Sequence, residues 1–350
     1  MDSIDPKDIY TTILKIPGTG VFMKTVSDNE MTAEMTKQFV ETHSAECNFY
    51  NNLAPIFDVP IPKVYQTLEW IIGKHDGCIH MEDLTKKGKV LAFYEDINLT
   101  QIKNVIKHLA HMHKNVLEMD SKIWEGKYLS NPDGLNHFID MLVPTIDTFK
   151  EKCKRKDAFN YIFKKLDHLI RNKDFYQYGL SKIHEDIKLK KIIVHGDLHL
   201  GNIVWAVNNH GEIKNEVAAI IDWQIMYEGS PMNDLARFLS MCASGIVRRQ
   251  AEIFAIDFYL ECLTKEFNGD SSKVPYTREK LQISYNYVFI CHILFLISGG
   301  ILLVSVEKDD EKFREACWDK IELKILMACE DAIKLLDGEM KDLFKKFGDK

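Results

Sequence analysis

The chain has 350 residues, of which 46% are hydrophobic and 28% are charged, a balance typical of globular proteins. This length allows one large domain or two lobes, each with a core of its own. The formal net charge of −7 argues against a nucleic-acid-binding protein, because such proteins usually carry a basic surface. A local basic pocket for an anion is still compatible with this charge.

The eight cysteines stand singly along the chain, without a C-x-x-C pair, so a zinc site has little support. The first residues, MDSIDPKDIY, are polar and acidic, and they lack the apolar segment of a signal peptide. Scattered thiols without an export signal are typical of a reducing compartment. We therefore expect a cytoplasmic protein.

The first part of the chain is predicted to form strands around one helix. TTILKI (residues 11–16) is rich in β-branched residues, which favour a strand. In residues 34–54 the apolar side chains recur at helical spacing. PKVYQTLEW (62–70) and GCIHMEDL (77–84) predict two further strands, and prolines precede the first of them.

After Leu84 the pattern becomes mostly helical. TKKGK (85–89) is interpreted as a linker, and Thr100 can cap a helix with an apolar stripe. Helical pattern also fills residues 135–178 and the stretch from Asp234 to the C-terminus. Strands followed by helices predict an α+β fold.

The apolar segment VFICHILFLISGGILLV (288–304) has 17 residues, at the short edge of what can span a membrane. His292, Ser298 and two glycines interrupt it. We therefore expect a buried core helix here and no membrane span.

A cluster of polar residues lies in VHGDLHLGNIVW (194–205), between flanks that are apolar enough to be buried. The apolar runs NIVWAV and VAAIID surround a turn sequence, and this pattern predicts a β-hairpin. The hairpin should return Asp222 to the neighbourhood of Asn202, with Asp197 in the loop before it. Two carboxylates and an amide oxygen are hard donors that suit Mg²⁺.

Kinases divide the catalytic work among the same residue types. One Asp accepts the proton of the attacking hydroxyl, while an Asn five residues later and an Asp on the next strand hold Mg²⁺. Asp197 and Asn202 keep the spacing of the motif H-R-D-x-x-x-x-N, with Gly196 in place of the Arg. That Arg often pairs with a phosphorylated activation loop, so its absence argues against a regulated protein kinase. Either motif alone could be a solvated turn or a strand end, but the two joined by a hairpin favour a catalytic site.

These motifs resemble the aminoglycoside phosphotransferase and choline kinase superfamily. HGDLHLGNIVW, followed by IIDWQIMYEGSPMNDLARFL, carries the resemblance, and the ecdysteroid-kinase-like (CHK kinase-like) group is the most similar. LAHMHK (109–114) matches a helix of the large lobe, and CIHMEDL matches the strand that enters the interlobe hinge. The resemblance extends from about Ile13 to the C-terminus. It implies a protein-kinase-like fold with an N-lobe over residues 1–84 and a C-lobe over residues 85–350.

The resemblance also implies ATP-dependent phosphorylation of a hydroxyl on a small molecule. Asp197 would be the catalytic Asp and His195 would brace its loop, while Asn202 and Asp222 would hold Mg²⁺. The substrate remains open among steroid alcohols, choline-like amines and glycosides.

Further positions match the superfamily pattern. Backbone groups near Glu82 and Leu84 would hold the adenine. Asp234 and Arg237, in NDLARF, match a motif that supports the active-site loop, and we interpret both as structural because an Asp before a helix is also an ordinary cap. His199 matches the pattern without an assigned role.

A kinase also needs a Lys on the third strand that pairs with a Glu of the following helix. Glu46 lies on the inward stripe of its predicted helix, where a carboxylate needs a cation or exposure. Lys15 in TILKIP is the family-like partner, and Lys24 in VFMKTV is the rival. Two solvated lysines and a partly exposed Glu are the plain alternative.

The sequence departs from the family before Lys15. Only 14 residues precede it, too few for the two strands of the glycine-containing hairpin. Gly18 and Gly20 form only a G-x-G, which is most often a turn. We therefore expect a truncated N-lobe sheet in which TTILKI is an exposed edge. This departure keeps open a second hypothesis, a catalytically impaired kinase-fold protein that binds a ligand or a partner.

Overall fold

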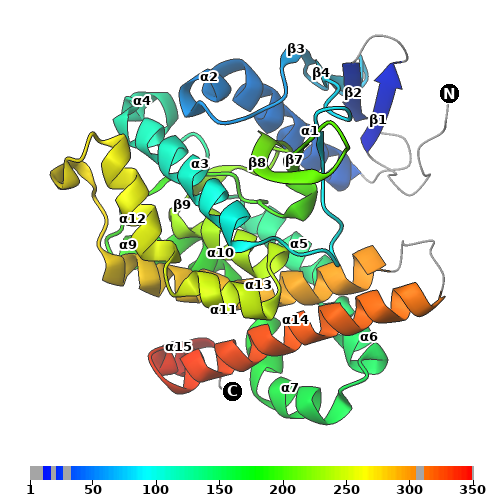
Figure 1. Ribbon diagram of the computed structural model, residues 1–350, viewed down its shortest axis with the longest axis vertical. Coiled ribbons are helices and arrows are strands. Elements are labelled where there is room, and N and C mark those ends of the chain that lie inside the picture. Colours follow the sequence, from blue (N-terminus) through cyan, green and yellow to red (C-terminus); the bar gives the residue numbers. More distant parts are fainter. Residues whose placement is uncertain (1–10, 17–20, 27–32, 305–310, 349–350) are drawn as a thin grey trace.

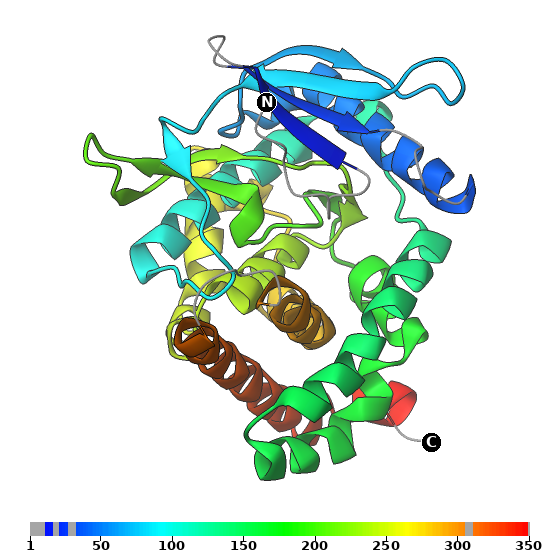
Figure 2. The same ribbon diagram turned by 90° about the vertical axis from the view of Figure 1, so that its right-hand side faces the viewer.

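The computed structural model describes residues 11–16, 21–26, 33–304 and 311–348, with side chains described for residues 36–302 and 311–348. These residues form a smaller lobe that contains a β-sheet and a larger lobe that is mainly helical (Figure 1). Figure 2 shows the sheet of the N-lobe lying over the helices of the C-lobe. The predicted α+β, two-lobed organisation is confirmed.

The N-lobe sheet contains the strands β1 (Thr11–Ile16), β2 (Val21–Val26), β3 (Val64–Leu68) and β4 (Gly77–Glu82). Their order is β1-β2-β4-β3, and each neighbouring pair is antiparallel. Helix α1 (Ala33–Asn48) packs against β4. β4 is therefore an inner strand, as β2 is, and the chain passes from β4 into the connection to the C-lobe.

The strand order corrects the expected position of TTILKI. As a third strand, this segment would lie next to β4. Instead β2 occupies that position, with Lys24 opposite Ile79, and β1 pairs with the other side of β2. Because only residues 17–20 separate β1 from β2, antiparallel pairing is the arrangement open to them. Among the described residues β1 is an edge strand, as expected.

The helix predicted over residues 34–54 is confirmed. It consists of α1, a π-helical turn (Phe49–Leu53) and the short helix α2 (Ala54–Phe57). Asp58 ends this segment in the left-handed conformation, with φ of 51°. Phe49, Leu53 and Phe57 are fully buried, so this segment anchors the N-lobe on the core.

Two small sheets carry the polar motifs at the junction of the lobes. β5 (Gly88–Lys89), β7 (Ile203–Val207) and β8 (Ile213–Ile220) form one of them, in the order β5-β7-β8. β6 (Ile192–Val194) and β9 (Tyr227–Gly229) form the other. The predicted hairpin is confirmed as β7–β8, whereas the predicted linker TKKGK ends in a strand that pairs with β7.

The C-lobe is built mainly from helices, as predicted. Its helices are α3 (Leu99–Glu118), α4 (Ser121–Trp124), α5 (Pro132–Leu142), α6 (Pro144–Lys152), α7 (Lys156–Ile170), α8 (Lys173–Tyr176), α9 (Ile183–Asp186), α10 (Met232–Cys242), α11 (Gly245–Glu252), α12 (Ala255–Glu266), α13 (Arg278–Val304), α14 (Glu311–Asp337) and α15 (Lys341–Phe347).

The N-terminus of α3 lies two residues before the predicted position. Asn98, not Thr100, is the N-cap, because its side chain accepts hydrogen bonds from the N–H groups of Thr100 (2.9 Å) and Gln101 (3.0 Å). The Gln101 side chain accepts in return from the Asn98 N–H at 3.0 Å. This reciprocal capping box satisfies N–H groups that the helix itself leaves unpaired.

The apolar helix α13 lies inside the C-lobe, against α10, α14 and α6. It is long and apolar enough to cross a membrane by composition, but its most apolar window is 83% buried in the protein. Thr145 Oγ1 and Ser298 Oγ are 2.8 Å apart, so a polar group of α13 has a partner inside the core. The predicted buried core helix is confirmed.

Candidate active site

The loop between β6 and β7 contains a glycine, Gly196, in a backbone conformation that other residues rarely adopt. Gly196 has φ of 83°, and a Cβ atom at this position would lie 2.5 Å from the Ile225 carbonyl oxygen. β6 pairs with β9, with Val194 opposite Tyr227, and this pairing brings the two segments into contact. An Arg, as in the protein-kinase motif, would be strained and would collide with the Ile225 backbone. The presence of Gly196 in place of the Arg of the protein-kinase motif therefore has a steric cause.

His195 joins this loop to the end of the β8 strand. Its Nδ1 accepts a hydrogen bond from the Asp197 N–H at 3.1 Å, so the proton of the neutral ring lies on Nε2. Nε2 then donates to the Ile221 carbonyl at 2.9 Å. The ring also packs on Trp223, with 4.5 Å between the centroids. These contacts hold the loop against the residue that precedes Asp222.

Asp234 fixes the loop from the first turn of α10. Its two carboxylate oxygens accept from the N–H groups of His195 (2.8 Å) and Gly196 (2.9 Å). The side chain is fully buried, and this burial raises its pKa, although His195, the two N–H groups and Arg237 act in the opposite direction. The alternative of an ordinary helix cap does not apply, because the carboxylate binds the loop and the N-cap of α10 is Pro231.

Asp197 is held on both oxygens. Arg237 Nη2 donates to Oδ1, while Asn202 Nδ2 donates to the Asp197 carbonyl (2.9 Å) and to Oδ2 (3.3 Å). Burial acts to raise the pKa of Asp197, but Arg237 and His199 outweigh it and hold the pKa well below its ordinary value. The carboxylate is ionised and has a fixed orientation.

His199, which had no assigned role, has two contacts in the loop. Its Nδ1 accepts from the Gly201 N–H at 3.0 Å and so caps the short helical turn that carries Asn202. Its Nε2 lies 3.5 Å from Asp197 Oδ2. His199 therefore orders the chain between Asp197 and Asn202.

The hairpin brings Asp222 next to Asn202, as predicted. The Ile221 N–H donates to the Asn202 carbonyl at 3.0 Å, so the two metal-ligand candidates sit beside one another on adjacent chain segments. Asp222 has φ of 67°, a conformation that costs energy for a side chain and is often found at functional sites. The Asn202 amide donates to Asp197, and its Oδ1 accepts no hydrogen bond from the described residues.

This donor set fits Mg²⁺ better than a transition metal. An amide oxygen and a carboxylate, completed by phosphate oxygens and water, match the ligands that Mg²⁺ prefers. Within residues 36–302 and 311–348, no three His, Cys, Asp or Glu side chains gather into a metal-binding group. Asn202 and Asp222 are therefore the residues that would hold Mg²⁺.

Glu46 reaches the same region from α1. It is 1% exposed, and together with Asp222 it acts electrostatically on the Tyr50 hydroxyl. Burial is the main reason why the pKa of Tyr50 lies well above its ordinary value, and the two carboxylates add to it. Tyr50 thus links the helix that carries Glu46 to the end of the hairpin. Sequence reasoning missed this residue, because a buried Tyr on an apolar stripe has the pattern of an ordinary core residue.

The lysine candidates lie in strands whose side chains are outside the described residues. Lys15 belongs to β1 and Lys24 to β2, so the pairing of either one with Glu46 stays a prediction. The backbone order changes the preference between them. The strand that precedes α1 and pairs with β4 carries Lys24.

The hinge candidates are partly engaged within the protein. The Leu84 carbonyl accepts from the N–H groups of Lys87 (2.8 Å) and Gly88 (2.9 Å). The Leu84 N–H makes no hydrogen bond with the described residues. Glu82 forms an ion pair with Lys87, and this pair lowers the pKa of the Glu82 carboxyl. The N–H of Leu84, rather than its carbonyl, is therefore the group suited to an adenine ring.

The chain matches a protein family over most of its length. The model of the DUF1679 family, described as "Uncharacterized oxidoreductase dhs-27", matches residues 13–340. The chain belongs to this family. The protein with that name from Caenorhabditis elegans is 28% identical over 256 residues, which cover 71% of this chain and 30% of the relative.

A second relative from Caenorhabditis elegans, "Uncharacterized kinase-like protein D1044.1", is 25% identical over 270 residues, which cover 73% of this chain and 65% of the relative. The chain thus spans less than two thirds of either curated relative. Among solved structures, choline kinase from Cryptosporidium parvum is 13% identical, with a TM-score of 0.46, and the match covers 98% of this chain and 94% of that chain.

Proposed function

We propose that this chain is an ATP-dependent phosphotransferase that acts on a hydroxyl of a small molecule. The observation that carries the proposal is the convergence of Asp197, Asn202 and Asp222 at one end of the β7–β8 hairpin. This arrangement supplies a carboxylate for the acceptor hydroxyl and two oxygen ligands for the metal of a nucleotide. The kinase-like description of one relative agrees with it.

In the proposed reaction the acceptor oxygen forms a bond to the γ-phosphorus of ATP. The bond between that phosphorus and the β–γ bridging oxygen breaks, ADP leaves with the electron pair, and the acceptor proton passes to Asp197. Mg²⁺, held by Asn202 and Asp222, would neutralise charge on the phosphates. Asp197 orients the hydroxyl, because Arg237 and Asn202 fix its two oxygens.

The sequence motifs support a more specific family relationship. We infer that the chain is related to the ecdysteroid-kinase-like group of the aminoglycoside phosphotransferase and choline kinase superfamily. Steroid alcohols, choline-like amines and glycosides are the acceptor classes that this group leaves open. The Leu84 N–H supports adenine binding at the hinge, and the strand order supports Lys24 over Lys15 as the lysine that pairs with Glu46.

The oxidoreductase name of the family comes from a relative of which the match covers only 30%. This chain has no G-x-G-x-x-G sequence, the glycine pattern of a dinucleotide-binding turn. The motifs of the matched part are those of a phosphotransferase.

One observation favours a second candidate, a catalytically impaired kinase-fold protein that binds a ligand. Both oxygens of Asp197 already have partners, and its pKa lies well below the ordinary value. A carboxylate of this kind is a weak base. Turnover measurements separate this candidate from the first.

The deciding experiment measures ADP formation with a panel of small alcohols, with and without Mg²⁺. We expect Asp197→Asn to lower phosphoryl transfer by at least about 100-fold while nucleotide binding is largely retained, because a positioned carboxylate contributes about that factor. Asp157→Asn, an exposed carboxylate on α7, is the control and should behave like the wild type. Wild-type turnover of Asp197→Asn would refute the assignment, and binding of Mg·ATP without transfer to any alcohol would favour the second candidate.

A further inference from the structure

The Tyr50 hydroxyl is a buried polar group that the fold leaves without a partner. The residue is 7% exposed, and its hydroxyl oxygen makes no hydrogen bond with the described residues. A buried hydroxyl without a partner costs free energy, so its presence calls for an explanation. Tyr50 lies in the π-helical turn Phe49–Leu53, a rare form of helix that often occurs at functional sites.

Aromatic packing holds this turn against the end of the β7–β8 hairpin. The neighbouring Phe49 stacks on Trp223, the residue after Asp222, with 4.0 Å between the ring centroids and 7° between the ring planes. Phe57 contacts the same indole in a T-shaped arrangement, with 5.8 Å between the centroids. All three rings are buried, so the segment that carries Tyr50 is fixed next to the segment that carries Asp222.

Two carboxylates lie near the Tyr50 hydroxyl. Burial is the main cause that raises its pKa, and the charges of Glu46 and Asp222 add to this effect, so the hydroxyl keeps its proton at neutral pH. The Asp222 N–H approaches the Tyr50 oxygen and acts in the opposite direction, but its geometry falls short of a hydrogen bond. The hydroxyl is therefore a donor without an acceptor in the described part of the chain.

Of the two nearby carboxylates, Asp222 is the candidate metal ligand and so the one that requires a fixed orientation. A carboxylate that binds Mg²⁺ through one oxygen has a second oxygen free to accept a hydrogen bond, and ligating carboxylates are usually held in this way. Asn202, the other candidate ligand, already has such support, because its amide donates to Asp197. Tyr50 is the residue positioned to give Asp222 the corresponding support.

We propose that Tyr50 is a positioning residue of the metal site, whose hydroxyl donates to the carboxylate of Asp222 when that carboxylate binds the metal of a nucleotide. This inference rests on the proposed phosphotransferase function, since it concerns the metal site of that reaction. One oxygen of Asp222 binds the metal, and Tyr50 holds the other. The π-helical turn after α1 thereby takes part in metal binding, although it contributes no metal ligand itself.

The test uses Tyr50→Phe, which removes the hydroxyl and keeps the ring. The Kd of the full chain for ADP is measured by titration calorimetry, once with saturating Mg²⁺ and once with EDTA. The ratio of the two Kd values gives the contribution of the metal to binding. We expect Tyr50→Phe to reduce this contribution at least about tenfold, as the loss of a hydrogen bond to a metal ligand typically does. ADP binding in EDTA should not change.

Thermal stability separates this role from a purely structural one. Because the Tyr50 hydroxyl has no partner among the described residues, its removal should leave the Tm of the metal-free protein unchanged or raise it. Tyr176→Phe is the matched control, since Tyr176 is also buried but its hydroxyl donates to the Ile170 carbonyl at 2.8 Å. This control should lower the Tm and leave the metal contribution unchanged.

Asp222→Ala, which removes the metal ligand itself, makes the outcomes distinguishable. If Asp222→Ala abolishes the metal contribution and Tyr50→Phe retains it, the inference about Tyr50 is wrong and the proposed function stands. If Mg²⁺ does not strengthen ADP binding to the wild type, both are wrong. The expected effect of Tyr50→Phe, without phosphoryl transfer to any alcohol, would support the role of Tyr50 and contradict the proposed function.

Discussion

Arg237 is a single residue that acts directly on the chemistry of the site, because it lowers the pKa of Asp197. The sequence motif alone indicates a structural role, but the Arg237 guanidinium contacts the carboxylate of Asp197, and the side chain also lines a cavity beside the catalytic loop. The side chain is 9% exposed and packs between Phe295 and His292, so its charge acts at short range in a region with little water. We regard Arg237 as a positioning residue, which holds Asp197 ionised and oriented.

This role predicts a change in the pH dependence of activity. In Arg237→Met the burial of Asp197 remains, while the cation that lowers its pKa is lost, so the pKa should rise. The acid limb of the kcat/KM profile should move to higher pH by about 1 to 3 units. Arg249→Met removes a distant surface cation and should leave the limb in place. If the acid limb of the kcat/KM profile stays at the same pH in Arg237→Met, Asp197 does not control that limb.

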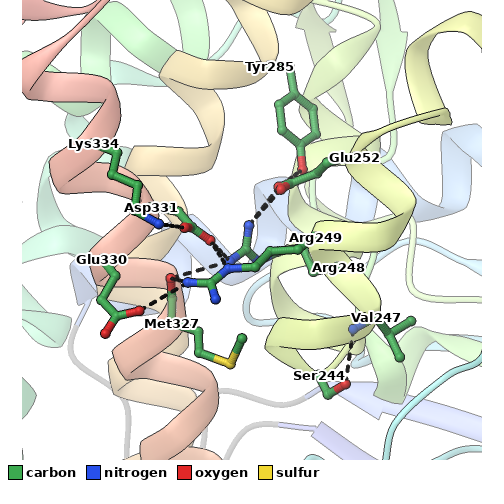
Figure 3. Close-up of polar contacts among 10 residues, drawn as sticks. All are labelled: Ser244, Val247, Arg248, Arg249, Glu252, Tyr285, Met327, Glu330, Asp331 and Lys334. Carbon is green, nitrogen blue, oxygen red and sulfur yellow. Dashed lines mark hydrogen bonds and ion pairs between the residues drawn. The ribbon is translucent and has the colours of Figure 1, made fainter.

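A group of ion pairs joins helix α11 to helix α14. Figure 3 shows Arg248 between Glu252 and Asp331, with Tyr285 of α13 donating to Glu252. Arg248 is 2% exposed, and its guanidinium lies 2.8 Å from both Glu252 oxygens and 2.5 Å from Asp331 Oδ2. Because each charge has partners, this cluster is a structural link and not a ligand site.

Loss of Arg248 should therefore be costly. Arg248→Met leaves Glu252 and Asp331 in a largely buried position with fewer partners, and we expect the free energy of unfolding to fall by about 3 kcal/mol. Urea denaturation measures this loss. The adjacent Arg249 also binds Asp331, at 2.7 Å, but it is 36% exposed, so Arg249→Met should cost less than about 1 kcal/mol. Equal losses in the two variants would contradict the importance of burial here.

The order of strands makes a prediction about the nucleotide site. Since β2 lies next to β4 and precedes α1, Lys24 rather than Lys15 should interact with the phosphates and Glu46. We expect Lys24→Ala to weaken Mg·ATP binding by at least about tenfold, the loss of one charged contact. Lys15→Ala is the matched variant on the neighbouring strand and should bind as the wild type does. The reverse result would restore the assignment to Lys15.

Over the whole molecule, His111 connects separate elements of the fold. It lies on α3, and its ring nitrogens are 3.0 Å from Asp58, at the end of α2, and 2.7 Å from Glu266, on α12. Partial burial acts to lower the pKa of His111, but Glu266 and Asp58 outweigh it and raise the pKa. The protonated ring therefore ties these elements together.

A raised pKa in the folded state means that His111 stabilises the fold most at low pH. This contribution is complete below the unfolded pKa of about 6.5 and disappears as the pH rises through the folded pKa. The Tm difference between the wild type and His111→Gln should thus be larger at low pH than at high pH. His108, on the same helix, has a pKa lowered mainly by burial, so His108→Gln should instead relieve instability at low pH. A constant Tm difference for His111→Gln would exclude this role.

The parts of this protein that were predictable from sequence are local in the chain. The five-residue step from Asp197 to Asn202 and the hairpin that returns Asp222 depend on neighbouring residues, and a short turn pairs the two strands in antiparallel orientation. The helical spacing in residues 34–54 and the apolar run in residues 288–304 identify buried helices for the same reason. These patterns determined the α+β fold class and the positions of the site motifs.

Tertiary structure decided what depends on contacts between distant segments. Arg237 meets Asp197 across 40 residues, and Thr145 meets Ser298 across 153. The strand order that separates Lys24 from Lys15, and the cavity between α1 and α13, likewise depend on packing. No spacing rule encodes such pairs, because many sequences bury the same apolar area with different neighbours. Local sequence patterns thus identified the candidate catalytic residues, whereas long-range packing determined which charges and surfaces surround them.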